Sequence, residues 1–168
     1  VSKDEREIYN KLGLDFIEPE MRENTGEIET AKQHKLPKLI KLSDIKGDCH
    51  MHTIETDGTS TMEEMIEQAM KIGREYIVFT DHTKALGITK GMDEKRILKQ
   101  IKLIEKMNKK YGDKIKILKG VELNIMENGE PDIKNSVLKQ LDVVVGSIHT
   151  GFKQTEEKIT RRTITAME

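Results

Sequence analysis

Four short apolar runs, separated by segments of helical periodicity, dominate the chain after Gly47. The runs read GDCHMHT, YIVFTDH, KIKILKGVEL and LDVVVGSIH. Alternating strands and helices predict a parallel sheet with helices packed outside it. The second and fourth runs are almost continuously apolar, which is typical of strands covered on both faces. We therefore predict an α/β fold with about four β/α units, arranged as part of a barrel, over residues 47–168.

The segments between these runs carry helix signals. They predict helices at about 61–72, 93–111 and 133–140, and a last helix from about residue 155 to the C-terminus. Ser60 and Glu63 predict a capping box for the first of these helices. Gly73 and Gly112 stand where a glycine commonly ends a helix.

Each apolar run ends in, or leads to, a side chain that can bind a metal ion. In the H-x-H pair of the first run, the two imidazoles share one face because side chains alternate along a strand. The carboxyl ends of parallel strands meet at one rim of a barrel, so ligands from different strands converge there. The sequence therefore predicts a metal site at that rim. Its candidate ligands are His50, His52, Asp57, His82, Glu122 and His149.

The predicted ligands are imidazoles and carboxylates, which favour Zn, Mn or Fe. Cys49 faces away from the histidine pair and is expected to be a packed core thiol. His34 lies in a polar segment and is interpreted as a solvated histidine. Because there are more than three ligands, we expect two or more ions bridged by Glu122. Such clusters hydrolyse phosphate esters with a metal-generated hydroxide, so His50, His52 and Glu122 are the predicted catalytic residues.

Residues 1–46 are polar, contain two prolines, and lack a sustained apolar period, so we expect a connector there. The chain has 29 Lys+Arg and 30 Asp+Glu, and this balance neither favours nor excludes a nucleic-acid partner. A single cysteine fits a reducing compartment. We find no signal peptide and no apolar stretch long enough to cross a membrane. These features predict a cytoplasmic protein without a membrane partner.

The motifs HMH, TDG, FTDH, GVELN and GSIHTGF occur in this order, and they resemble the PHP (polymerase and histidinol phosphatase) family of metal-dependent phosphoesterases. The resemblance spans residues 47–168 and implies a distorted, TIM-like barrel of seven strands. The preceding stretch from REIYNKLGL to LSDIKGD resembles the junction between polymerase core and PHP domain in bacterial and archaeal family X DNA polymerases. Residues 1–46 would then connect to a preceding polymerase core.

The resemblance also implies a ligand scheme with up to three ions. One ion would be held by His50, His52 and Glu122, and Glu122 would bridge it to a second ion at His149. Asp57 and His82 would hold a third. The implied cofactor is a cluster of Mn or Zn, or alternatively Fe. The implied activity is 3′–5′ exonuclease or other 3′-end processing in DNA repair, so that the partner is a DNA 3′ end presented by the parent polymerase.

Family members continue beyond the position of Glu168, where they supply a further histidine and a D-x-H pair. The resemblance therefore implies a C-terminally truncated barrel in which each ion lacks one ligand. A barrel cut after four strands exposes an unpaired edge. We accordingly expect the isolated fragment to bind metal weakly, to be inactive, and to self-associate across that edge.

Substrate contacts are predicted at Lys84 and Lys153, which follow His82 and His149 and are placed to meet a substrate phosphate. The lysine-rich run within 93–111 is interpreted as a solvated helix face. Two other functions stay open. One is a small-molecule phosphatase of the histidinol-phosphate kind, and the other is a non-catalytic module that supports a polymerase core.

Overall fold

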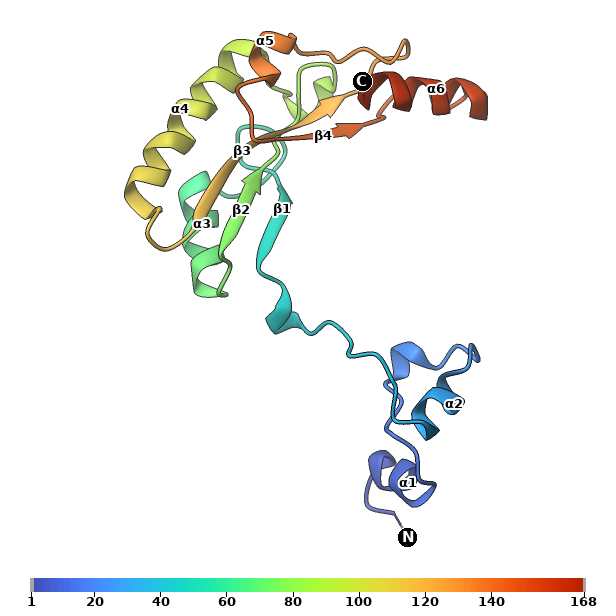
Figure 1. Cartoon of the computed structure of the whole chain (residues 1–168). Helices are drawn as coiled ribbons and strands as arrows, with labels where there is room; N and C mark the ends of the chain where they lie inside the picture. The colour runs from blue at the N-terminus through green and yellow to red at the C-terminus, as the bar shows by residue number, and fades with distance from the viewer. Residues whose placement is uncertain (1, 168) are drawn as a thin grey trace. The chain divides into compact units, whose positions relative to one another are not determined.

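The computed structural model describes residues 2–167 and divides the chain into two compact units, Val1–Asp44 and Ile45–Glu168 (Figure 1). The second unit contains the four strands and is the larger. Among the described residues, no helix is both long and apolar enough to span a membrane.

The strands of the second unit form one parallel sheet that curls as a partial barrel (Figure 1). They are β1 (Gly47–Met51), β2 (Tyr76–Phe79), β3 (Lys116–Asn124) and β4 (Val143–Ser147). Their order in the sheet equals their order in the chain, which is the winding of a barrel rather than of a doubly wound sheet. The prediction of a partial α/β barrel is confirmed.

Helices occupy every crossover between the strands. They are α3 (Met62–Lys71), α4 (Glu94–Tyr111) and α5 (Asn135–Leu138), and α6 (Glu156–Met167) follows β4. The expected helix at 133–140 is therefore confined to its central turn. The capping box of α3 lies one residue later than predicted. Thr61, not Ser60, has the extended backbone of an N-cap, and its side chain and that of Glu64 exchange the two bonds.

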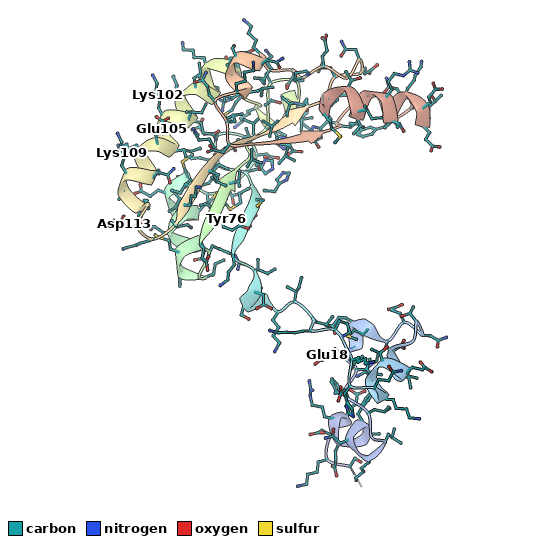
Figure 2. The ribbon with its side chains drawn as sticks, viewed as in Figure 1. Glu18, Tyr76, Lys102, Glu105, Lys109 and Asp113 are labelled. Carbon is teal, nitrogen blue, oxygen red and sulfur yellow. The ribbon has the colours of Figure 1, made fainter. Side chains whose placement is uncertain are left out.

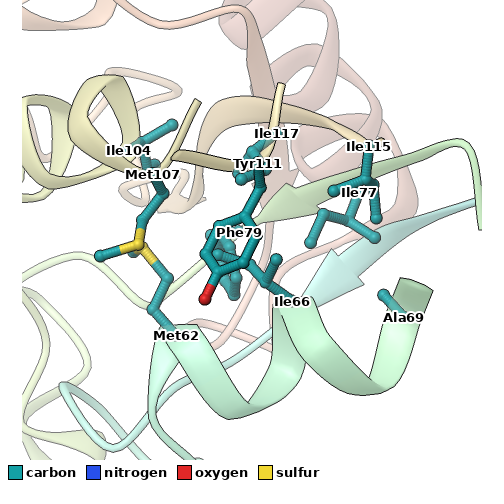
Figure 3. Packing of buried hydrophobic residues seen from close by; sticks show 10 residues of the cluster. All are labelled: Met62, Ile66, Ala69, Ile77, Phe79, Ile104, Met107, Tyr111, Ile115 and Ile117. Atoms are coloured by element: carbon teal, nitrogen blue, oxygen red, sulfur yellow. The ribbon is translucent and has the colours of Figure 1, made fainter. Parts of the chain in front are cut away.

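The main core lies between the sheet and the helices α3 and α4. Phe79 and Ile77 of β2 are fully buried against Ile66 of α3 and Ile104 of α4 (Figure 3). Ile97, Ile101 and Ile104 recur at helical spacing and turn one face of α4 inward. Most apolar packing therefore uses one face of the sheet, and the opposite face, where Val78 is also buried, carries polar side chains toward its carboxyl end.

Cys49 departs from its predicted role as a packed core thiol, because it is exposed. It lies in β1, the edge strand of the sheet, whose pairing with β2 shifts register between Asp48 and Met51. That irregularity breaks the strict alternation on which the prediction rested.

The first unit is more ordered than a plain connector. It contains α1 (Glu5–Lys11), η1 (Pro19–Met21), α2 (Glu27–Lys32) and η2 (Leu42–Asp44). Ile17 and Ala31 are buried as a small core, and Arg22 donates two hydrogen bonds to the Ile17 carbonyl. Proline begins η1, and Gly26 caps α2 with a left-handed φ of 101°. Both breaker residues therefore start short helices here.

Replacing a buried phenylalanine should cost far more stability than replacing an exposed one. Phe79 is 0% exposed and Phe152 is 70% exposed. We predict that Phe79→Ala lowers the free energy of unfolding by about 3–5 kcal/mol, and Phe152→Ala by less than about 0.5 kcal/mol. Urea denaturation of both variants measures this. Equal losses would contradict the assigned core.

Candidate metal centre

Strand alternation places the candidate ligands on the sheet face opposite the helices. In β3, Val121 and Leu123 point into the helix-covered core, so Glu122 and Asn124 point the other way. Glu122 pairs in register with Val145 of β4 and forms a bridge to His82 beyond the end of β2. The carboxylate of Glu122 thus stands at the centre of the sheet's carboxyl edge.

Four imidazoles surround this carboxylate. Its Oε2 lies 3.2 Å from His50 Nε2, 3.3 Å from His52 Nε2 and 3.3 Å from His82 Nδ1. Its Oε1 lies 3.1 Å from His149 Nε2. The two oxygens therefore lie next to different histidines, which is the arrangement that a bridging carboxylate requires.

The Asp57 carboxylate contacts two of these histidines, His52 and His82. Its Oδ1 lies 3.2 Å from His52 Nδ1, and its Oδ2 lies 3.3 Å from His82 Nε2. The structure thus brings together all six candidate ligands that were chosen from the sequence.

Three overlapping sets of ligand atoms are close enough to hold an ion. They are His50–His52–Glu122, His52–Asp57–His82 and His82–Glu122–His149. A neutral imidazole has a single lone-pair nitrogen, so His52 and His82 can each serve one ion at a time. The six residues therefore cannot complete all three sets together.

The residues fit divalent metal ions. Nδ1 of His52 and Nδ1 of His82 are buried and form no hydrogen bond, although a carboxylate oxygen lies 3.2 Å from the first and 3.3 Å from the second. Buried nitrogen atoms without partners are costly, and Nε2 of His50 lies only 3.0 Å from Nε2 of His52. Crowded imidazole nitrogens beside two carboxylates form a ligand set suited to Zn or Mn.

Asp81 fastens the loop that carries Asp57. This carboxylate is 0% exposed and accepts hydrogen bonds from Thr53 N, Thr53 Oγ1, Thr56 Oγ1 and Gln100 Nε2. Thr53 follows His52 directly and Thr56 precedes Asp57. No sequence pattern predicted this role, although Asp81 stands in the same FTDH motif as His82.

Burial and charge keep two ligands in the form that binds metal. Burial lowers the pKa of His82 below its usual 6.5, although the nearby Glu122 charge opposes this effect. Burial alone would raise the pKa of Glu122, but a hydrogen bond from Ser147 and the neighbouring histidines outweigh it and lower that pKa. At neutral pH, His82 is therefore neutral and Glu122 ionised.

The two predicted substrate lysines differ in their surroundings. Lys84 forms an ion pair with Glu94, with 2.9 Å between Nζ and Oε1, while Lys153 is exposed. His34 is exposed, as expected, and contacts Asp15 in the first unit. Lys102 and Lys109 extend from α4 away from the sheet together with Glu105 (Figure 2), as expected for a solvated face.

Comparison with known proteins gives a family and several relatives. The model of the PHP domain family matches residues 48–167. A DNA polymerase/3′-5′ exonuclease PolX of Bacillus subtilis is 40% identical over 163 residues, which cover 97% of this chain and 28% of that protein. A probable phosphatase of a Thermoanaerobacter species is 34% identical over 119 residues, covering 69% of this chain and 45% of that protein.

Among solved structures, a histidinol phosphate phosphatase of Lactococcus lactis matches with a TM-score of 0.49 and 23% identity. The match covers 64% of this chain and 41% of that one. The chain thus spans between about a quarter and a half of these relatives.

The lowered pKa of His82 makes stability depend on pH. In the unfolded chain His82 binds a proton near pH 6.5, whereas in the folded chain it does so only at lower pH. The contribution of neutral His82 to the free energy of unfolding is therefore complete above pH 6.5 and is lost as the pH falls below it. We predict that the unfolding temperature of the metal-free protein falls between pH 7.5 and pH 5.5, and that it falls less in His82→Asn.

The matched control for this measurement is His34→Asn, which removes an exposed histidine outside the site. It should keep the full pH dependence of the wild-type protein. If His82→Asn and His34→Asn give the same thermal-melt profile as wild type, the stability assigned to neutral His82 is wrong.

Proposed function

The chain belongs to the PHP domain family of metal-dependent phosphoesterases, and from this premise we propose that it hydrolyses phosphodiester bonds at DNA 3′ ends. The proposed setting is a family X DNA polymerase in the cytoplasm, where the domain acts as a 3′–5′ exonuclease or 3′-end processing activity in DNA repair. The residues proposed to hold the divalent ions are the two carboxylates, Glu122 and Asp57, and the four histidines around them.

One observation carries the choice of DNA as substrate. The Bacillus polymerase aligns with 97% of this chain, so the alignment must extend through most of residues 1–46, before the PHP match begins at residue 48. The first unit has its own core around Ile17 and Ala31. Its likeness to the polymerase supports a role beside a polymerase core, which presents DNA ends.

The side chains have separate roles in the proposed reaction. Bound divalent ions supply a lowered water pKa and stabilise charge on phosphate oxygens. Glu122 is ionised and buried, and because its two oxygens face different histidines, each oxygen would serve as a ligand to a divalent ion. His50 is the most open ligand, with its side chain 47% exposed. We place substrate entry on its side of the site.

The metal is proposed to be manganese or zinc, with iron as a further alternative. Both are compatible with imidazole and carboxylate ligands. Asp57 contributes oxygen ligands and thereby favours manganese at its ion. Lys153, four residues after His149 on an exposed loop, is proposed to contact the substrate phosphate.

A small phosphate ester is the second candidate substrate. The relatives named as probable phosphatases support it, because one of them is 34% identical to this chain over 119 residues. The metal chemistry would be identical, and only the contacts around the scissile phosphate would differ. The two candidates are therefore separated by substrate rather than by site.

The decisive assay compares the two substrates with the protein in its full natural length. We predict manganese-dependent removal of 3′ nucleotides from a 3′-recessed duplex, and little hydrolysis of histidinol phosphate. His50→Ala and Glu122→Gln should each reduce DNA hydrolysis at least about 100-fold. Losing even a residue that only supports a ligand costs about 10- to 100-fold.

The matched control is His34→Ala, the same substitution at the one histidine outside the cluster. It should retain wild-type activity. DNA hydrolysis that survives in His50→Ala would refute the assigned site. Hydrolysis of histidinol phosphate alone would favour the small-ester function, and inactivity on both substrates would favour a non-catalytic module.

A further inference from the structure

Asn124 lies two residues beyond Glu122 on the same face of β3 and is 4% exposed. Its Oδ1 is 2.7 Å from Nδ1 of His149. This asparagine is the last residue of the GVELN motif. Because side chains two apart on a strand share one face, its position after Glu122 places it at the site.

The orientation of the Asn124 amide is fixed by groups that can only accept hydrogen bonds. Its Nδ2 donates to the Thr83 carbonyl at 3.1 Å and to Asp132 Oδ2 at 3.1 Å. A carbonyl oxygen and a carboxylate accept but do not donate. The nitrogen must therefore face Thr83 and Asp132, and the oxygen must face His149.

This orientation decides which nitrogen of His149 carries a proton. An amide oxygen only accepts, so Nδ1 of His149 has to be the donor. In neutral imidazole a proton on Nδ1 leaves the lone pair on Nε2. That nitrogen is the one that lies 3.1 Å from Glu122 Oε1, on the side of the ligand cluster.

The support behind Asn124 is built from two further loops. Thr83 follows His82, and its hydroxyl donates to Asp132 Oδ1 at 2.8 Å. Asp132 lies between β3 and α5, and its Oδ2 also accepts from Ala85 N at 2.8 Å. By contrast, Nδ1 of His52 and Nδ1 of His82 have no hydrogen-bond partner among the described residues.

We propose that Asn124, locked by Thr83 and Asp132, is the positioning residue that holds His149 in its Nδ1–H form and aims Nε2 at the metal site. The inference rests on the proposed metal-dependent function, and it deepens that function by making one ligand of the cluster directional. Partners of this kind fix the orientation and raise the basicity of metal-binding histidines.

Zinc binding to the 168-residue chain tests the proposal without any activity assay. Zn²⁺ is diamagnetic, so long-range ¹H–¹⁵N NMR of His149 reports both its protonated nitrogen and the affinity of the ion that it binds. We expect Nδ1–H with Nε2 bound to zinc in wild type. Asn124→Ala should weaken zinc binding at His149 about 10- to 100-fold and abolish the Nδ1–H signature. Asn124→Asp keeps an acceptor facing Nδ1 but turns a carboxylate oxygen toward the Thr83 carbonyl and Asp132, so it should retain the Nδ1–H signature while lowering the unfolding temperature.

Asn108→Ala is the matched control. Asn108 is a partly buried asparagine whose side chain bonds both the N–H and the carbonyl of Ile117, at the opposite end of β3. The Asn108→Ala substitution should lower the unfolding temperature and leave the zinc affinity at His149 unchanged. The proposal is overturned if Asn124→Ala keeps wild-type affinity and signature, if Asn108→Ala loses as much affinity, or if His149 binds no zinc in wild type. Normal zinc binding with the expected variant effects, but without hydrolysis of either substrate, would support this proposal while refuting the proposed function.

Discussion

The site depends on the contacts between the buried carboxylate of Glu122 and the histidines around it. A carboxylate with 8% of its side chain exposed has four imidazole nitrogens within 3.1 to 3.3 Å of its two oxygens. Burial of such a charge is unfavourable unless opposite charges or donors compensate it. Here Ser147 hydrogen-bonds to Glu122, and ligand atoms from three other strand ends would place a compensating divalent ion beside it.

The fold produces this convergence because the helices pack on one face of the sheet and the ligand side chains lie on the other. Helices α3 and α4 bury one face of the sheet around Phe79, which leaves Glu122 and its neighbours on the other face. Because the four strands are parallel and follow one another in order, their carboxyl ends meet along one edge. Asp81 and Asn124 then hold the loops and rings at that edge with buried hydrogen bonds. The ligands are thus organised by the protein itself, before any ion is considered.

Much of this arrangement follows from sequence patterns, since strand alternation and strand-end position are local properties. They were enough to bring His50, His82 and Glu122 into one site and to predict a partial barrel. Details that depend on geometry between elements were not predictable in this way. Cys49 is exposed because its strand lies at the sheet edge with an irregular register, and no local pattern reports strand order. Likewise, the role of Asp132 depends on contact with a residue 49 positions away.

The central claim is that Glu122 joins two metal ions whose other ligands come from separate strands. X-ray anomalous scattering at the zinc edge, from crystals of the chain grown with Zn²⁺, tests this directly. The account predicts ions at about 2.0–2.2 Å from each oxygen of Glu122, one shared with His50 or His52 and the other with His149 Nε2. Zinc found only on surface carboxylates, with the histidines still packed against an ion-free Glu122, would contradict it.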